Sequence, residues 1–106
     1  MDLATECYEV TKRFPRDELF GMTSQIRRAS SSVPANIAEG YGRDSTGDYV
    51  RFFRIAQGSL KETETHLLLA QRVGLVSSDA LAPLLTRSGE IGRMLRALYR
   101  KLEGGR

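Results

Sequence analysis

The sequence predicts an all-α protein that folds as an antiparallel, up-down four-helix bundle, with residues 1–106 forming one domain. Apolar residues recur every three or four positions along the chain, and no segment shows the alternation that is typical of strands. A length of 106 residues suits a single domain. The composition, 41% hydrophobic and 27% charged, supplies enough apolar surface for a folded core. Four apolar stripes with short breaks between them therefore indicate four helices.

The first stripe predicts a helix over about residues 1–14. It runs from Leu3 to Phe14 in steps of three and four, and Pro15 follows it. This helix is the shortest of the four, and no capping residue precedes it. Because the helices of a bundle tend to have matched lengths, we expect the natural helix to begin upstream of Met1.

The second stripe, from Met22 to Ile37, predicts a helix over about residues 18–42. Pro34 lies inside it and deprives the carbonyl of Ser30 of its usual partner. Because the stripe continues in phase across the proline, we predict one kinked helix and not two. The hydroxyls of the serines at 30–32 are candidates to bond backbone groups near the kink.

Two longer helices are predicted over about residues 46–73 and 78–103. Ser45 and Asp48 have the spacing of a capping box at the start of the first. Gly74 suits the left-handed conformation that ends it. Ser77 or Ser78 caps the second, Gly104-Gly105 closes it, and its apolar residues follow the heptad spacing of a bundle seam: Leu81, Leu84, Ser88, Ile91, Leu95, Leu98 and Leu102.

The charge balance is mildly basic. Sixteen Lys and Arg residues against thirteen Asp and Glu give a net charge of +3, and thirteen of the sixteen are Arg. Arginine suits phosphate and carboxylate partners alike, so this bias fits RNA, DNA or an acidic protein. The single cysteine, Cys7, favours a reducing cytoplasm. No apolar run approaches the ~20 residues of a membrane span, and no membrane partner is expected.

The candidate chemical groups argue against an enzyme. The one histidine, His66, has Glu62 four residues before it, and two ligands are too few for a structural metal site. Cys7 lies on an apolar stripe and is expected to be buried. We therefore predict no catalytic residue, metal, cofactor or small-molecule substrate.

A polar flank beside the core stripe suggests a subunit interface. At 100° per residue, several polar residues of the second helix fall on one edge, and the third helix has a similar flank. The alternative is a solvated flank whose ion pairs are worth about 0–1 kcal/mol each. The candidate interface residues are Gln25, Arg28, Asn36, Glu39, Arg43, Ser59 and Glu62.

Basic residues gather in two places and are candidates for nucleic-acid binding. One group surrounds the start of the third helix, and another runs along the fourth. The alternative is again a solvated face, since Asp48, Glu90 and Glu103 lie near these cations. The candidates are Arg51, Arg54, Arg93, Arg96, Arg100 and Lys101.

Several motifs resemble one bacterial protein family. The segments that carry the resemblance are residues 14–15 (Phe-Pro), 23–29 (Thr-Ser-Gln-Ile-Arg-Arg-Ala), 33–43 (Val-Pro-Ala-Asn-Ile-Ala-Glu-Gly-Tyr-Gly-Arg) and 52–65. They are similar to the four-helix-bundle family named after proteins encoded in intervening sequences of 23S ribosomal RNA genes. Family members usually carry a leader containing Trp, which this sequence lacks, in agreement with the short first helix.

The resemblance implies an antiparallel bundle that assembles into a ring, a homopentamer. The accessory factor of diversity-generating retroelements looks like a relative, and it is a basic pentamer that partners a reverse transcriptase and RNA. Most other members have no assigned activity. The sequence thus predicts a non-enzymatic, ring-forming scaffold or adaptor of the bacterial cytoplasm, whose partners are itself and an acidic protein or RNA/DNA. The alternative function is an RNA/DNA-binding accessory protein.

Overall fold

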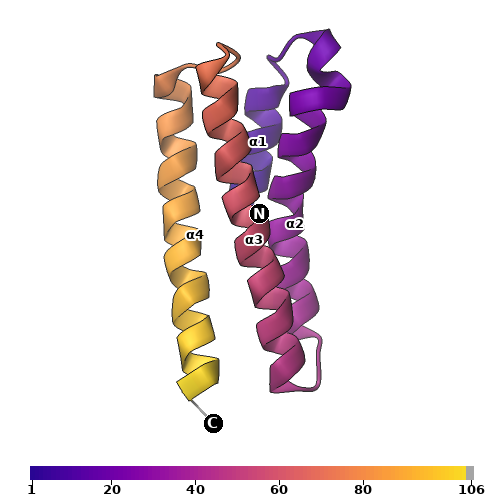
Figure 1. Cartoon of the computed structure of the whole chain (residues 1–106), viewed down its shortest axis with the longest axis vertical. Coiled ribbons are helices and arrows are strands. Elements are labelled where there is room, and N and C mark those ends of the chain that lie inside the picture. The colour runs from indigo at the N-terminus through magenta and orange to yellow at the C-terminus, as the bar shows by residue number, and fades with distance from the viewer. Residues whose placement is uncertain (105–106) are drawn as a thin grey trace.

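The computed structural model describes residues 1–104, and within them it contains four main helices and no strand. The helices are α1 (Asp2–Thr11), α2 (Ser24–Tyr41), α3 (Thr46–Arg72) and α4 (Ser78–Gly104). They lie along the long axis of an elongated molecule measuring 48 × 23 × 18 Å (Figure 1). The prediction of an all-α protein is confirmed.

The helix α1 is much shorter than its neighbours and accompanies only part of their length. It contacts α2 and α4 in the upper part of the molecule, and the N-terminus lies near the middle of the long axis (Figure 1). The helix α3 packs against both α2 and α4. The α2–α3 loop and the α3–α4 loop lie at opposite ends of the molecule (Figure 1).

The core consists of the predicted apolar stripes. Residues from all four helices are almost fully excluded from solvent, which removes apolar surface from water and stabilises the fold. Buried hydroxyls are satisfied within or between helices: Thr63 donates to the carbonyl of Ser59 at 2.8 Å, and Ser88 donates to Glu64 at 2.6 Å. The largest fully buried apolar side chains are Leu3, Ile26, Phe53, Leu67, Leu81, Leu84 and Leu95.

The connection between α1 and α2 differs from the prediction. The helix α1 ends at Thr11, not near residue 14, and the Thr11 hydroxyl donates to the carbonyl of Cys7 at 2.7 Å. A 3-10 turn (Arg16–Glu18) and a π-helical turn (Leu19–Thr23) occupy the first residues of the predicted second helix. Gly21 there has non-helical angles (φ −103°, ψ −111°), and the Glu18 side chain accepts from the amide of Met22. A glycine's conformational freedom permits this break.

The helix α2 continues across Pro34, so one helix is present where one was predicted. The serine hydroxyls before the proline donate to carbonyls one turn back: Ser31 donates to Arg27 at 2.8 Å, and Ser30 donates to the same carbonyl at 3.3 Å. These bonds lie within the helix, on the turn before Pro34, and the kink itself stays a prediction.

The predicted helix caps are present. Ser45 is the N-cap of α3 and accepts from the amide of Asp48 at 3.2 Å. Ser77 accepts from the amide of Ala80 at 3.1 Å at the start of α4. Gly74 has φ +85° after α3, as the left-handed helix ending requires. The predicted closing residue Gly105 lies outside the described residues.

Replacing the N-cap of α3 tests this local bonding. We expect Ser45→Ala to lower the free energy of unfolding by about 1 kcal/mol, because the amide of Asp48 loses its acceptor. Urea denaturation followed by circular dichroism measures the change. Ser45→Asp should retain the stability of the parent, since aspartate also caps helices. Equal losses in both variants would contradict the capping role.

Candidate functional site

The α2–α3 face is the polar surface where the predicted interface residues lie. The hydroxyl oxygens of Ser32 and Ser59 are 2.8 Å apart, which joins α2 to α3. Asn36 donates to the carbonyl of Ser32 at 2.8 Å and to its hydroxyl at 2.9 Å. The structure therefore brings Asn36 and Ser59 together through Ser32, which the sequence places on the same polar edge but which is not among the predicted interface residues.

The charged residues of the α2–α3 face pair with residues three or four positions away along the chain. Arg43 binds Glu39 at 2.8 Å, with 42% and 57% of the two side chains exposed. Arg28 donates to Gln25 at 2.7 Å and not to a carboxylate. Exposed pairs of this kind are worth at most about 1 kcal/mol. These pairs contribute little to stability, but they hold the long side chains of Arg28 and Arg43 in place along one edge of the α2–α3 face.

The same polar edge continues on α3. His66 lies 3.5 Å from Glu62, one helical turn away. The guanidinium of Arg43, in the α2–α3 loop, lies over the ring of Phe52 at 4.7 Å, so the loop packs on α3. Arg51 stacks on the same ring at 4.8 Å. The structure thus places Arg51 with the α2–α3 face, apart from the cations of α4.

Apolar side chains are exposed among these polar groups. Ile55 is 42% exposed, Leu69 is 46% exposed and Val73 is 62% exposed. These residues fall on the same side of α3 as Ser59 and Glu62. Ile55 is four residues before Ser59, and Leu69 is seven residues after Glu62, so each pair is separated by about one or two helical turns. A surface that mixes exposed apolar residues with ordered polar ones is typical of subunit contacts.

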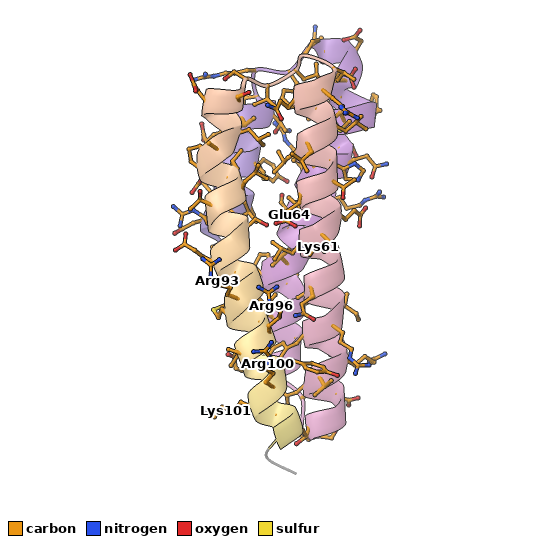
Figure 2. All side chains as sticks on the ribbon, turned by 60° about the vertical axis from the view of Figure 1, so that its left-hand side comes forward. Lys61, Glu64, Arg93, Arg96, Arg100 and Lys101 are labelled. Atoms are coloured by element: carbon orange, nitrogen blue, oxygen red, sulfur yellow. The ribbon has the colours of Figure 1, made fainter. Side chains whose placement is uncertain are left out.

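A second surface, the α3–α4 face, is basic. Its cations are Arg54 and Lys61 of α3 with Arg93, Arg96 and Arg100 of α4. Figure 2 shows Arg93, Arg96 and Arg100 spaced along the lower part of α4, with Lys61 on α3 nearby. Among residues 1–104, none of the three α4 arginines takes part in a described salt bridge.

One carboxylate on this face, Glu64, is already engaged by neighbouring side chains. Glu64 binds Lys61 at 3.3 Å and accepts from Ser88 at 2.6 Å, and 21% of its side chain is exposed. Arg54 has its guanidinium over the Tyr99 ring at 5.0 Å and donates to the Tyr99 hydroxyl. Lys101 lies 100° around α4 from Arg100, apart from the row, and lines a hollow with Tyr49 and Leu98. The exposed guanidinium groups of Arg93, Arg96 and Arg100 present positive charge to the solvent.

The groups that were weighed for catalysis are not arranged for it. Cys7 is buried, and burial raises the pKa of its thiol to about 11, although a hydrogen bond with Ser30 opposes the shift. A thiol with a raised pKa is a poor nucleophile at neutral pH. Among residues 1–104, no three His, Cys, Asp or Glu side chains are grouped to hold a metal ion. None of the described helices combines the length and apolar character that crossing a bilayer demands.

The fold agrees with comparisons to known proteins. A family model described as 23S rRNA-intervening sequence protein matches residues 1–97. The chain belongs to this family. A crystal structure of a protein of unknown function from the S23 ribosomal protein family of Bacteroides thetaiotaomicron VPI-5482 is similar, with a TM-score of 0.84. The two proteins are 25% identical over 93% of each chain. No curated protein matches the chain.

The family match covers the two faces unequally. Residues 1–97 of this 23S rRNA-intervening sequence protein contain the whole α2–α3 face, together with Arg93 and Arg96. Arg100 and Lys101 lie beyond the matched range. The solved relative has no known function, so the family assignment establishes neither an activity nor a partner.

Proposed function

We propose that this protein is a non-enzymatic scaffold or adaptor of the bacterial cytoplasm, in which antiparallel bundles assemble through the α2–α3 face into a ring of five copies. The observation that supports this most is the exposure of Ile55, Leu69 and Val73 within a polar surface whose side chains are already hydrogen-bonded. The ring size follows the family resemblance. The only partner that the assembly requires is the protein itself.

The chemistry of the α2–α3 face suits association between copies. Burying the exposed apolar residues removes them from water, which is the main favourable term in association. The Ser32–Ser59–Asn36 cluster is ordered before any contact forms, so little side-chain entropy remains to be lost there. The charged side chains of Arg28, Glu39 and Arg43 would lie at the polar rim of the subunit contact. Charges at a rim determine how two copies align more than how tightly they bind.

Multi-angle light scattering of the purified protein tests the assembly. Five copies of an 11.8 kDa chain give about 59 kDa. A monomer near 12 kDa at all concentrations would overturn the proposal, and a different multiple would keep the assembly but change the ring size.

A second candidate function is binding of RNA or DNA, and the α3–α4 face favours it. Arg93, Arg96 and Arg100 form a row along α4, and none of the three forms a salt bridge within residues 1–104. Each phosphate that such cations neutralise releases counterions and adds affinity. A ring would repeat the row in every subunit, so the effect would multiply. An acidic protein is the other partner that this row fits.

Salt dependence tests the second function. We expect the triple substitution of Arg93, Arg96 and Arg100 by Gln to flatten the slope of log affinity against log salt for a single-stranded RNA. The slope should fall by about 0.7 for each phosphate that the substituted side chains no longer neutralise. Fluorescence anisotropy measures it, with Arg16→Gln, an exposed arginine outside both faces, as the control. No RNA binding by the parent at ~50 mM salt would exclude this function.

A further inference from the structure

A hollow lies where the chain turns from α1 into α2, at the upper end of the molecule (Figure 1). Its volume is about 420 Å³, within the range of pockets that enclose a small organic ligand. We name it the α1–α2 hollow. The C-terminal half of α1, the π-helical turn and the first two turns of α2 supply its lining: Tyr8, Leu19, Phe20, Thr23, Ser24, Arg27, Arg28 and Ser31.

Two aromatic rings at the α1–α2 hollow are open to solvent. Phe20, beside the non-helical break at Gly21, is 93% exposed and therefore contributes little to the core. Tyr8 on α1 is 43% exposed and lines the same hollow. Aromatic side chains in such positions stack on flat rings, and on nucleobases in particular. The lining thus favours a ligand with a planar ring.

Arg27 is already fixed in place at the α1–α2 hollow. Its Nε donates to the Thr11 hydroxyl at 2.9 Å, and its guanidinium lies over the Tyr8 ring, 4.7 Å from the centroid. Within residues 1–104, no described bond engages its two terminal nitrogens. Because Thr11 and Tyr8 hold the side chain, little conformational entropy remains to be lost when these nitrogens bind an anion.

The charge of the α1–α2 hollow is positive. Arg28 follows Arg27 in sequence and donates to Gln25 at 2.7 Å. Neither arginine forms a salt bridge within residues 1–104, and no Asp or Glu lines the hollow. Glu18, in the preceding turn, accepts from the amide of Met22 at 3.3 Å. Two arginines in this setting favour a ligand that carries a phosphate or a carboxylate.

A buried hydroxyl at the α1–α2 hollow distinguishes between these two anions. Thr23 is 4% exposed and lines the hollow, but among residues 1–104 its hydroxyl has no described hydrogen-bond partner. A buried hydroxyl without a partner costs free energy, which an acceptor on a ligand would recover. A phosphate has three peripheral oxygens, so it can accept from Thr23 and from both arginines at once. A carboxylate has only two, so phosphate is the better fit.

We propose that the α1–α2 hollow binds a free nucleoside monophosphate. The base stacks on the Phe20 ring, and the phosphate accepts from Arg27, Arg28 and Thr23. A phosphate alone would fill only part of about 420 Å³, so the hollow suits a phosphate joined to a ring. No His, Cys, Asp, Glu or Lys lines it, so the nucleotide is a bound ligand and not a substrate. One chain supplies the whole site, so the inference does not depend on ring assembly.

Isothermal titration calorimetry of the full chain tests the class of ligand. The probes are adenosine 5′-monophosphate and uridine 5′-monophosphate, and adenosine and inorganic phosphate each represent one half of the ligand. We expect a nucleotide to bind at least about tenfold more tightly than either half, because ring and phosphate both contribute contacts. No binding of either nucleotide at about 1 mM would overturn the proposal. Adenosine or phosphate binding as tightly as the nucleotides would also overturn it.

Variants with matched controls locate the site. Thr23→Val removes only the hydroxyl and should weaken nucleotide binding about tenfold, whereas Thr23→Ser keeps the hydroxyl and should bind like the parent. Phe20→Ala alters a side chain that is 93% exposed, so folding should be retained while nucleotide affinity falls at least about fivefold. Phe20→Tyr keeps the ring and should bind like the parent. Unchanged affinity in both Thr23→Val and Phe20→Ala would overturn the assignment of the site.

The end of a nucleic-acid strand is the other source of a nucleoside phosphate. An RNA hexamer with a 5′-phosphate and the same hexamer with a 5′-hydroxyl distinguish the two sources. If the phosphorylated hexamer binds, loses affinity in Phe20→Ala and has no counterpart among the free nucleotides, then the free-nucleotide proposal is wrong. Equal or tighter binding of a free nucleotide supports it.

A variant of the α2–α3 face separates this proposal from the assembly. Nucleotide binding should be unchanged in the double variant Ile55→Asp with Leu69→Asp, because neither residue lines the α1–α2 hollow. A protein that proves monomeric would therefore still bind the nucleotide. Loss of binding in the double variant would overturn the assignment of a site within one chain.

Discussion

The substitution Phe53→Ala is expected to lower the free energy of unfolding by about 3–5 kcal/mol. Phe53 is 2% exposed, and its ring packs edge-to-face against Tyr41 at 5.5 Å and Tyr49 at 6.1 Å between ring centroids. Gly40 approaches so closely that an added Cβ would lie 2.9 Å from the Phe53 ring. Alanine would leave a cavity at the junction of α2 and α3, where these rings meet.

The control for this prediction is another phenylalanine. Phe20 is 93% exposed, and Phe20→Ala should change the free energy of unfolding by less than about 0.5 kcal/mol. Urea denaturation at one fixed protein concentration compares both variants with the parent, since assembly makes stability depend on concentration. Similar losses at the two positions would show that the ring of Phe53 is not an anchor of the core.

The double substitution Ile55→Asp with Leu69→Asp is expected to reduce the assembly to monomers. Each change places a charge within the exposed apolar part of the α2–α3 face, and burial of an unpaired charge opposes association strongly. Light scattering should show the mass falling from about 59 kDa to about 12 kDa. Circular dichroism should remain that of a helical protein, because both side chains are 42–46% exposed in the bundle.

A neighbouring leucine provides the matched control for assembly. Leu68→Asp introduces the same charge on α3 at a side chain that is 47% exposed, but 100° around the helix from Leu69. The ring should persist in this variant. Loss of the ring in both variants, or its survival in both, would contradict the use of the α2–α3 face.

The sequence predicted the helices better than their ends. The apolar stripes and the cap at Ser45 are local patterns, and a pattern of period 3.6 identifies a helix without any tertiary information. The break at Gly21 was missed because it lies just before Met22, the first residue of the apolar stripe, so it interrupts no pattern, and glycine is compatible with both outcomes. A change in the φ and ψ angles of a single residue is enough to move the end of a helix, so helix ends are harder to predict than the helices themselves.

The surfaces could be predicted only in part, for a similar reason. Helical angles group the polar residues of α2 on one edge, and they do so from the sequence alone. The contact of Ser32 with Ser59 depends on the register of α2 against α3, which no periodicity within one helix specifies. Arg51 was grouped with other cations by proximity in sequence, but its stacking on Phe52 depends on a rotamer.

The helix α3 contributes to the core, to the α2–α3 face and to the α3–α4 face, and this limits how the gene can change. Its 27 residues present the core stripe, the exposed stripe of Ile55 and Leu69, and the side that bears Arg54 and Lys61. Inserting or deleting one codon in its middle would rotate everything beyond by 100°, exchanging these sides. Only changes of a whole heptad would preserve the phase. Length variation between relatives should therefore accumulate in the connections at residues 42–45 and 73–77, and be nearly absent within α3.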